Sequence, residues 1–498
     1  MSPLSSFDDH LSAPRGRGRL TPGDAGVHSG AAGGAPCGDL VRLDLRVRGD
    51  SVAEAGFEAR GCGAAIAAGS AAVELVSGRP VLEAARIDLD GIAQELGGLS
   101  PAKRHAAVLA ADALHRALGA AAGSGAVQLA ARPDRTLVAM SGGVDSAVAA
   151  HLVAAEGHDV VAVTLELWAD AAGDGTQSCC SPEAVTGARA LAHAMGFPHF
   201  TLDLRASFRA RVVEDFVSER AAGRTPNPCV RCNGLVRFAE MLELAGRLGA
   251  ARLATGHYAR VGHDREGPLL RAAADGAKDQ TYMLARLAPG DLDRLHFPLG
   301  DLVKAEVRAI ARAAAIPVAD RAESQDLCFL AGTDGAAFQR RHGSAGVDAG
   351  EIVDGSGAVL GHHAGQHLFT VGQRRGLGVP AREPLYVLRK EPRNGRVVVG
   401  PRSALATDWV EVGPARLERD ADEVDRVKLR YRAAPVPCRL EGTAGRGRHE
   451  RVVVRLGRAV DGVAPGQTAC FLSGDRVVGF GMICGADTGV LRGDVHAA

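Results

Sequence analysis

The sequence predicts a multidomain protein with a small α+β domain, a doubly wound α/β domain with a parallel sheet, a small β-rich domain and a C-terminal β-barrel. Apolar strands alternate with helical patterns between about residues 135 and 255, as at Leu137–Met140 and Val160–Leu167, which favours a parallel α/β sheet. Beyond about residue 335 the helical patterns fade, and short strands separated by glycines follow. The chain has 498 residues, enough for roughly three or four domains.

Composition limits the class of protein. Lys and Arg together number 58, as do Asp and Glu, so any nucleic-acid site has to be a local surface and not a global field. The sequence contains no signal-peptide-like run and no stretch of about 18 apolar residues, so we expect a cytoplasmic protein without a membrane segment. Ten cysteines, several in close pairs, favour reduced thiols for metal or sulfur chemistry over a disulfide framework.

Changes in composition set the expected domain boundaries. Residues 1–33 lack apolar periodicity, so we expect them to be disordered. An alternating strand at Val41–Val47 and helical patterns at roughly 64–77 and 101–121 indicate the α+β domain. The expected boundaries, in chain order, are 34–122 for the α+β domain, 123–134 for a linker of small residues, 135–334 for the α/β domain, 335–410 for the central domain and 411–498 for the barrel.

The segment Ser141–Ser146, Ser-Gly-Gly-Val-Asp-Ser, joins an apolar strand to an Ala-rich helical pattern. Backbone N–H groups at such a helix N-terminus favour a phosphate group. Gly-Lys-Ser/Thr does not follow, so the loop is not a Walker loop. The segment resembles the PP-loop of ATP pyrophosphatases, enzymes that attach AMP to an oxygen and then displace it with a nitrogen or sulfur nucleophile.

A second group of motifs carries thiols. Gly223–Asn233 is a loop stiffened by prolines that displays Cys229 and Cys232, and Cys328 follows about a hundred residues later. These segments resemble those of tRNA-specific 2-thiouridylases, the MnmA family, over roughly residues 135–485. Further matches to that family occur at Thr255–Tyr258, Lys278–Tyr282, Thr370–Gly378 and Pro465–Gln467.

The resemblance implies an ATP-dependent reaction, with Mg²⁺, on the wobble uridine of a tRNA anticodon. ATP adenylates the C2 carbonyl oxygen and releases pyrophosphate, and sulfur then displaces AMP to give 2-thiouridine. The resemblance assigns the persulfide to Cys328 and the role of catalytic nucleophile to Cys232, and it makes the central domain a tRNA-binding domain. It assigns ATP to Ala139, Met140, Ser141, Gly142, Gly143, Val144, Asp145, Ser146, Leu165 and Gly256. It assigns the target base or tRNA to Asn227, Pro228, Cys229, His257, Lys278, Asp279, Gln280, Arg430, Tyr431 and Gln467.

Cys229 departs from the family pattern, in which many members have Asp. Cys229, Cys232 and Cys328 could therefore ligate three irons of a 4Fe–4S cluster, whose fourth iron would carry sulfide to the activated base. The alternative is that Cys229 packs within its loop. Both interpretations remain open at this point.

The first domain also carries candidate metal ligands. Its segments Pro36–Asp39, Gly61–Ala65 and Lys103–His105 resemble the NifU N-terminal or IscU iron–sulfur scaffold. In that family a third cysteine follows the histidine, whereas this chain has Ala106. Zinc or an iron–sulfur cluster remains chemically suited to a ligand set of Cys37, Asp39, Cys62 and His105. The alternative is a degenerate docking module for a cysteine desulfurase, and a desulfurase or sulfur-relay protein is the expected partner.

Basic residues supply an expected local RNA surface. They are Arg374, Arg375, the segment Lys390–Arg396, and Arg426, Lys428, Arg430 and Arg432, the last four expected on one face of a barrel strand. Two other functions remain: an amidating PP-loop ligase, against which Cys232 and Cys328 argue, and an iron–sulfur carrier that only binds tRNA, against which the intact Ser141–Ser146 segment argues.

Overall fold

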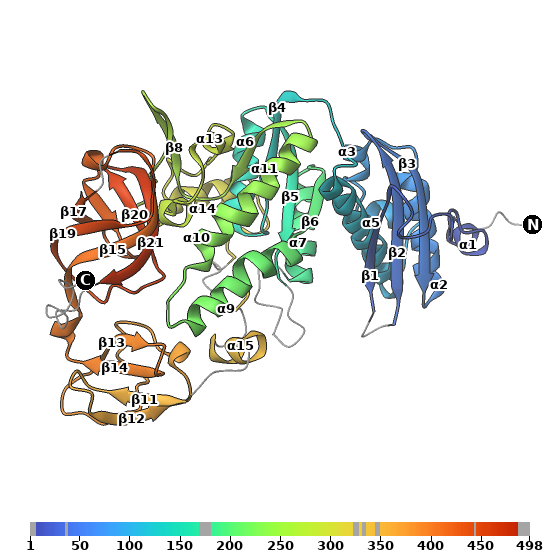
Figure 1. Cartoon of the computed structure of the whole chain (residues 1–498). Coiled ribbons are helices and arrows are strands. Elements are labelled where there is room, and N and C mark those ends of the chain that lie inside the picture. The colour runs from blue at the N-terminus through green and yellow to red at the C-terminus, as the bar shows by residue number, and fades with distance from the viewer. Residues whose placement is uncertain are drawn as a thin grey trace, which may run out of the picture. The chain divides into compact units, whose positions relative to one another are not determined.

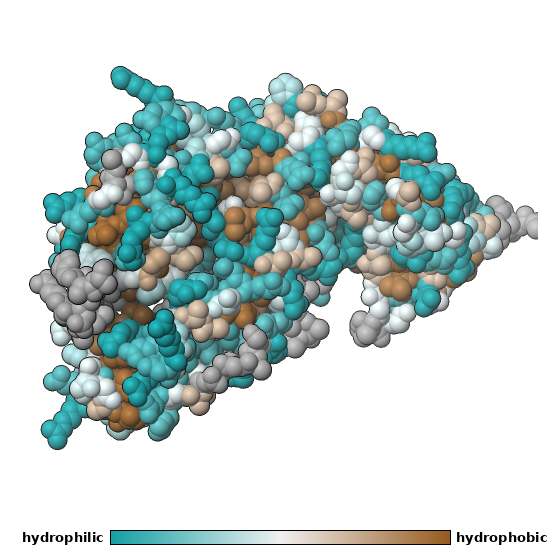
Figure 2. Space-filling model, viewed as in Figure 1, coloured by the Kyte–Doolittle hydropathy of each residue, from teal (hydrophilic) through white to brown (hydrophobic). Residues whose placement is uncertain are grey.

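The computed structural model describes residues 6–34, 38–168, 181–321, 328–330, 335–343, 349–442 and 445–486 (Figure 1). The chain divides into two compact units. The first comprises residues 1–206, 239–257 and 294–329, and the second comprises residues 207–238, 258–293 and 330–498. Figure 2 shows mainly hydrophilic residues on the face in view. No helix in the described part of the chain is long and apolar enough to cross a membrane.

The first domain is an antiparallel sheet, ordered β1-β2-β3, with helices packed against it. Its elements are α1 (Ser6–Ser12), β1 (Val27–Gly33), β2 (Leu40–Arg48), β3 (Ser51–Arg60), α2 (Gly63–Val76), α3 (Val81–Ala84), α4 (Leu89–Glu95), η1 (Pro101–Lys103) and α5 (Arg104–Ser124). The alternate residues Val41, Leu43 and Leu45 of β2 are fully buried. The predicted α+β domain is therefore confirmed, with strands and helices close to the expected positions.

The expectation of disorder over residues 1–33 is wrong for the described residues from Ser6 onward. Helix α1 packs on α2, and β1 pairs along its whole length with β2. Strand β1 lacks apolar alternation because α5 crosses it closely. A Cβ atom on Gly30 would lie 2.3 Å from both the carbonyl oxygen of Ala113 and the amide nitrogen of Ala117. Only small residues fit there. Their abundance gives the segment a composition typical of disordered chains, which explains the wrong prediction.

The second domain of the first unit is the predicted parallel α/β sheet, ordered β10-β7-β4-β5-β6. Its elements are β4 (Arg132–Ala139), α6 (Val144–Ala155), β5 (Asp159–Glu166), α7 (Pro182–Ala194), β6 (His199–Asp203), α8 (Arg205–Phe208), α11 (Phe238–Arg247), β7 (Ala250–Thr255), β10 (Leu295–His296) and α14 (Lys304–Ala313). The chain leaves the central strand β4 toward β5 and later returns on its other side as β7. The carboxyl end of β4 is therefore the topological switch point, where ligands bind in such sheets.

Helix α5 is shared by the two domains of the first unit. It packs on β1 and β2 and also covers β6, the edge strand of the parallel sheet. A Cβ atom on Gly119 would lie 1.8 Å from the carbonyl oxygen of Thr201 in β6, so the helix backbone approaches the strand directly. An Arg189–Asp112 ion pair of 2.9 Å lies in the same contact.

The segment 123–134 differs from the expected linker. Helix α5 continues to Ser124, and β4 begins at Arg132. Between them the amide of Leu129 donates to the carbonyl of Arg247 at 2.8 Å, and the amide of Arg132 donates to Gly249 at 2.8 Å. Hydrogen bonds to the parallel-sheet domain therefore fix this connection.

The second unit contains the predicted β-rich central domain. Its sheet is ordered β12-β11-β14-β13. Its elements are α15 (Gly335–His342), β11 (Gly350–Val353), β12 (Val359–His363), η5 (Gln366–Leu368), β13 (Tyr386–Glu391) and β14 (Arg396–Gly400). Short strands were expected beyond about residue 335, but residues 369–378 form turns and irregular backbone instead. Phe369 and Leu377 are buried in the core of this domain, so their apolar character reflects packing and not strand pairing.

The C-terminal domain is the predicted barrel, in which β15-β19-β17-β16-β20-β21 closes because β21 also pairs with β15. Its elements are η6 (Arg402–Leu405), β15 (Ala406–Leu417), η7 (Ala421–Glu423), β16 (Arg426–Lys428), β17 (Val436–Glu441), β18 (Gly447–His449), β19 (Val452–Asp461), β20 (Thr468–Ser473) and β21 (Arg476–Ala486). The hairpin β8 (Arg260–Asp264) and β9 (Gly267–Arg271) extends this sheet. Arg430 and Arg432 follow β16 in a turn, so the expectation that they share a strand face with Arg426 and Lys428 is wrong.

The second unit also contains short helices, one of which, α10, carries Cys229 and Cys232. They are η3 (Arg209–Val213), α9 (Glu214–Ala221), α10 (Pro228–Cys232), η4 (Asn233–Arg237), α12 (Thr281–Leu284) and α13 (Pro289–Leu292).

Candidate functional site

The predicted nucleotide loop lies at the switch point, between β4 and α6. Gly142 has φ of +75°, a left-handed conformation that glycine adopts readily. The hydroxyl of Ser146 accepts a hydrogen bond from the amide of Ser141 at 3.1 Å and donates to the carbonyl of Gly143 at 3.0 Å. These bonds tie both ends of the turn together. The loop is therefore held in shape by its own serine.

Two cations that the sequence analysis did not single out contact this loop. Lys304, at the start of α14, lies with Nζ 2.6 Å from Oδ1 of Asp145, and its side chain is only 13% exposed. Arg321 donates from Nη1 to the carbonyl oxygen of Gly142 at 3.0 Å. Lys304 follows β10, which is parallel to β7. Its position after an adjacent strand was the available signal, but the two-residue β10 is too short to predict from periodicity.

The other expected ATP residues also lie at the carboxyl edge of the sheet. Gly256 directly follows β7, and a Cβ atom on it would lie 2.7 Å from the carbonyl carbon of Asp145 and from the amide nitrogen of Ser146. Only glycine fits where this turn meets the loop. Leu165 lies near the end of β5 and pairs with Leu202 of β6. The structure thus brings the segment Ala139–Ser146 together with Gly256.

The Cys229 and Cys232 thiols lie on α10. The side-chain oxygen of Asn227 accepts hydrogen bonds from the amides of Cys229, at 3.1 Å, and Val230, at 3.3 Å, which caps the helix. Pro228 occupies its first turn, where proline is favoured. Cys229 is half-buried and Cys232 is buried.

Cys328 is half-buried and belongs to the first unit, whereas the α10 cysteines belong to the second. Cluster ligation by the three cysteines therefore stays a prediction.

Several residues expected to meet tRNA also shape loops of the second unit. Gln280 accepts from the amide of Tyr258 at 3.0 Å through its side-chain oxygen. Gln467 donates from Nε2 to the carbonyl of Thr225 at 2.7 Å, in the loop that precedes the thiol helix. These two glutamines hold neighbouring segments in place, so an effect on RNA binding has to be separated from an effect on the loops.

The charged members of that expected group are also anchored. Asp279 accepts from the amide of Ala273 at 3.2 Å and lies 3.4 Å from Nζ of Lys428. Arg430 donates to the carbonyl oxygen of Gly462. Tyr431 contacts Tyr282 with ring centroids 6.3 Å apart. His257, which belongs to the first unit, lies with Nδ1 2.8 Å from the hydroxyl of Thr255.

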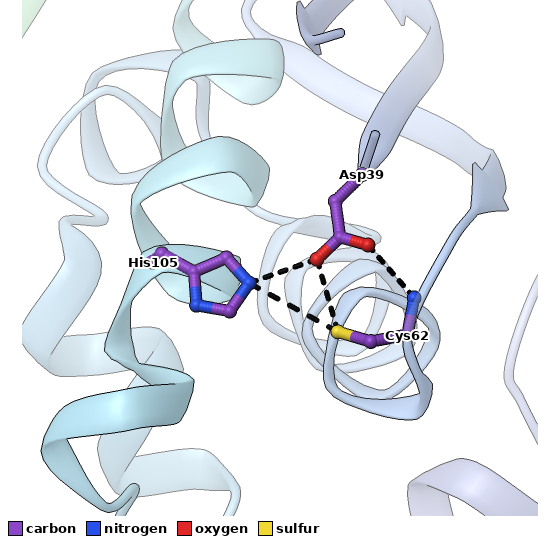
Figure 3. Close-up of side chains that lie close together, drawn as sticks. All are labelled: Asp39, Cys62 and His105. Carbon is purple, nitrogen blue, oxygen red and sulfur yellow. Dashed lines mark hydrogen bonds and ion pairs between the residues drawn. The ribbon is translucent and has the colours of Figure 1, made fainter. Parts of the chain in front are cut away.

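Asp39, Cys62 and His105 converge in the first domain (Figure 3). Oδ2 of Asp39 lies 3.0 Å from Sγ of Cys62 and 2.8 Å from Nε2 of His105, and that nitrogen lies 4.0 Å from the sulfur. Asp39 precedes β2, Cys62 is the N-terminal cap of α2, and His105 lies in the first turn of α5. Cys37, the fourth expected ligand, lies outside the described residues, and Ala106 is fully buried.

Both ring nitrogens of His105 face acceptors. Nδ1 lies 2.9 Å from the carbonyl oxygen of Ala102 and Nε2 lies 2.8 Å from Oδ2 of Asp39. A carbonyl and a carboxylate only accept, so the protonated ring satisfies both contacts, and a metal would bind Nε2 in place of its proton while Nδ1 keeps the bond to Ala102. Hydrogen bonds from Cys62 and His105 lower the pKa of Asp39 to about 2, and Asp39 raises the pKa of His105. A carboxylate, a thiol and an imidazole are thus gathered around one point.

Four family models match successive parts of the chain. They are the NifU-like N terminal domain over residues 6–124, the tRNA methyl transferase HUP domain over 134–332, the tRNA methyl transferase PRC-barrel domain over 340–401 and the Aminomethyltransferase beta-barrel domain over 408–483. A bifunctional protein NifU/MnmA from Rubrobacter xylanophilus is 48% identical over 492 residues, which span 96% of this chain and 98% of that protein. The chain belongs to the bifunctional NifU/MnmA family.

Shorter relatives align with the MnmA part of the NifU/MnmA chain. The tRNA-specific 2-thiouridylase MnmA of Rhodospirillum centenum is 44% identical over 365 residues, covering 71% of this chain and 92% of that protein. The one from Geobacter metallireducens is 42% identical over 370 residues, covering 71% and 98%. Both resemblances found in the sequence, and the predicted order of folds, are therefore confirmed.

Proposed function

We propose that this chain is a tRNA-uridine 2-sulfurtransferase that carries a NifU-like sulfur or iron–sulfur module. The observation that carries the proposal is the preformed loop Ser141–Ser146 at the switch point, to which Lys304 is fixed at 2.6 Å from Asp145. Relatives that span the whole loop-containing part are named tRNA-specific 2-thiouridylases. An amidating ligase would not require Cys232 and Cys328.

The first step adenylates the uridine. The C2 carbonyl oxygen attacks the α-phosphorus of ATP, and the bond to the bridging oxygen of pyrophosphate breaks. The loop amides and Lys304 stabilise the negative charge that develops on the leaving pyrophosphate. Asp145 is the carboxylate of the loop and would be the ligand for Mg²⁺, with Lys304 beside it. The product is an O-adenylated base, whose phosphoester is a far better leaving group than an oxygen on carbon.

The second step delivers sulfur. The thiolate of Cys232 attacks the inner sulfur of a persulfide on Cys328, so a disulfide forms between the two cysteines and hydrosulfide is released. Hydrosulfide attacks C2, the C–O bond breaks, and AMP leaves. An external thiol reductant then restores both cysteines. Thiolates are nucleophilic near neutral pH. The Cys232 thiolate and the Cys328 persulfide together give one disulfide and one hydrosulfide.

Cys229 makes a second sulfur route possible, because it adds a third thiol to Cys232 and Cys328. In that route Cys229, Cys232 and Cys328 would hold a 4Fe–4S cluster, which would supply the sulfide for the activated base. Iron and sulfide analysis of the full chain prepared without oxygen separates the routes. Loss of iron in Cys229→Ala but not in Cys438→Ala, which alters a barrel thiol, supports the cluster. Full thiolation by an iron-free wild-type chain contradicts it.

The first domain is proposed to bind zinc or an iron–sulfur cluster through Asp39, Cys62 and His105, with Cys37 as a candidate fourth ligand. Their donor atoms suit either metal group. When bound, an iron–sulfur cluster would supply sulfur. The alternative is that the domain is a docking module for a cysteine desulfurase or sulfur-relay protein. Asp39 contacts both Cys62 and His105, so the three side chains already lie as metal ligands would.

The experiment that tests the proposed function follows pyrophosphate, AMP and 2-thiouridine in single turnover with tRNA, ATP and a persulfide donor. Cys232→Ser and Cys328→Ser should release pyrophosphate but form little AMP or thiolated product, because activation precedes sulfur transfer and AMP leaves only when sulfur attacks. Cys484→Ser, which alters an exposed barrel thiol, is the matched control and should behave as wild type. Normal thiolation by Cys328→Ser with the persulfide donor would remove it as the sulfur carrier.

A further inference from the structure

Three basic side chains, of which Arg220 and Lys390 are cations, meet in the second unit where the end of α9, η5 and β13 converge. Arg220 lies in the last turn of α9, His367 lies in η5 and Lys390 lies in β13. Gly223, with φ of +75°, follows α9 in this contact. A Cβ atom on Gly223 would lie 2.9 Å from Cγ of Pro392 and 3.6 Å from Cβ of Lys390. The three elements are therefore closely packed and fix the cations in position.

The cations are oriented by carbonyl oxygens. Arg220 donates from Nη2 to the carbonyl oxygen of His367 at 2.6 Å, and Lys390 donates from Nζ to the carbonyl oxygen of Phe369 at 2.9 Å. The Nε atom of Arg220 and the Oε1 atom of Gln366 are buried and have no hydrogen-bond partner. Donor capacity on both cations is therefore left over after these contacts.

No carboxylate among the described residues forms an ion pair with Arg220 or Lys390. The neighbouring acids are engaged elsewhere, since Glu219 pairs with Arg224 and Glu391 pairs with Arg389. Burial lowers the pKa of Arg220, and burial together with Arg220 lowers the pKa of Lys390 to about 8.

His367 is 5% exposed. Burial lowers its pKa, and Arg220, Lys390, Arg340 and His363 lower it further, so His367 is a neutral imidazole beside the two cations.

Two partly buried cations without a carboxylate partner are costly for the folded protein. The cost is removed when an anion with several acceptor oxygens enters. A phosphate group fits this requirement, because guanidinium and ammonium groups both donate to its oxygens. Arg220 and Lys390 are only partly buried, so a phosphate at the surface can reach their donors.

We propose that Arg220 and Lys390, supported by His367, form a binding site for one phosphodiester of the tRNA backbone. This inference rests on the proposed function, which makes tRNA the substrate. It concerns a site formed by α9, η5 and β13 and involves none of the residues in the nucleotide loop. The phosphate contact positions the RNA without reading its sequence.

The test measures tRNA affinity of the full chain without ATP, over a series of salt concentrations. Lys390→Met and Lys390→Gln should each weaken binding by roughly 10-fold near 0.1 M salt and reduce the slope of log affinity against log salt by about 1. Lys390→Gln retains an N–H donor toward Phe369. Lys103→Met removes the same charge in η1 of the first domain and should leave both quantities unchanged.

Free protein stability separates a binding role from a structural one. If Lys390 binds phosphate, Lys390→Met should leave the thermal midpoint unchanged or raise it, because a buried unpaired charge is removed. A lowered midpoint with unchanged tRNA affinity, or wild-type affinity in Lys390→Gln, overturns the proposal. Weakened ATP or pyrophosphate binding with intact tRNA binding also overturns it, since the phosphate would then come from the nucleotide. If the wild type itself binds no tRNA, the proposed function fails instead.

Discussion

Replacing Gly119 by alanine tests whether α5 joins the first two domains into one body. Alanine is the better helix former, so this change in a helix interior ordinarily stabilises by about 1 kcal/mol. At Gly119 the new methyl group would lie 1.8 Å from the carbonyl oxygen of Thr201, where real Cβ atoms essentially never come under 3.0 Å. The atom in the way belongs to the backbone of β6. Helix and strand therefore have to separate.

Separation strains the contacts around that point. The Arg189–Asp112 pair of 2.9 Å and the Arg116–Glu166 pair of 2.8 Å both join α5 to the parallel-sheet domain. Overpacking a tight contact costs about 1–3 kcal/mol. The expected net change is thus a destabilisation of the docked arrangement by about 1–3 kcal/mol, opposite in sign to the helix propensity.

Hydrogen exchange of the β6 amides measures this change in the full chain, because it reports local opening in a protein that need not unfold in one step. We expect exchange across His199–Asp203 to accelerate roughly 5- to 100-fold in Gly119→Ala. Gly187→Ala in α7, where nothing lies within 4 Å of the added Cβ, is the matched control and should be as protected as wild type. Unchanged protection of β6 in Gly119→Ala would refute the close contact.

Three further predictions follow from individual side chains. Lys304→Met should reduce tRNA-dependent pyrophosphate release by about 100-fold or more, because it removes a cation at the leaving group, while tRNA affinity is unchanged; release equal to that of Lys103→Met would contradict this. Asp39→Ala should lower the zinc or iron bound by the full chain, measured by elemental analysis, whereas Cys438→Ala in the barrel should not; equal metal content in both variants would show that Asp39 is not a ligand. The pKa of Lys390 falls from 10.5 to about 8 on folding, so the unfolded chain binds more protons between those values and stability rises with pH across that window. The rise is at most about 3 kcal/mol, and a Lys390→Met variant with the same pH dependence of urea unfolding would disprove it.

Hydrophobic periodicity predicted most of the fold because the strands that bury apolar side chains carry those residues at regular intervals in the sequence. Alternation at Val41, Leu43 and Leu45 reflects one buried face, and the apolar runs of β4 and β5 reflect strands covered on both faces. Strand β1 was not predicted, because it packs against the backbone of a helix and this contact requires small residues such as Gly30. A strand made of small residues has the same composition as a disordered segment.

The candidate sites were predictable where short motifs hold the chemistry. The loop Ser141–Ser146 follows from one motif at a strand-to-helix turn, and the Asp39–Cys62–His105 group follows from three short segments that together resemble the NifU family. Lys304 and Arg321 were not predicted as part of the site, because only the order of strands in the sheet brings them close to the loop. Arg220 and Lys390 were not identified as a pair because they lie 170 residues apart and meet through tertiary packing.

The central claim is that one chain couples AMP formation to sulfur transfer on tRNA. Its most direct test is a single-turnover reaction in which pyrophosphate, AMP and 2-thiouridine are counted together for the same tRNA, with persulfide-loaded full-length protein. We predict one pyrophosphate and one AMP for each 2-thiouridine in the wild type, pyrophosphate with neither AMP nor 2-thiouridine in Cys232→Ser, and none of the three products in Asp145→Ala. Thiolated tRNA formed without AMP, or formed by Asp145→Ala, would contradict it.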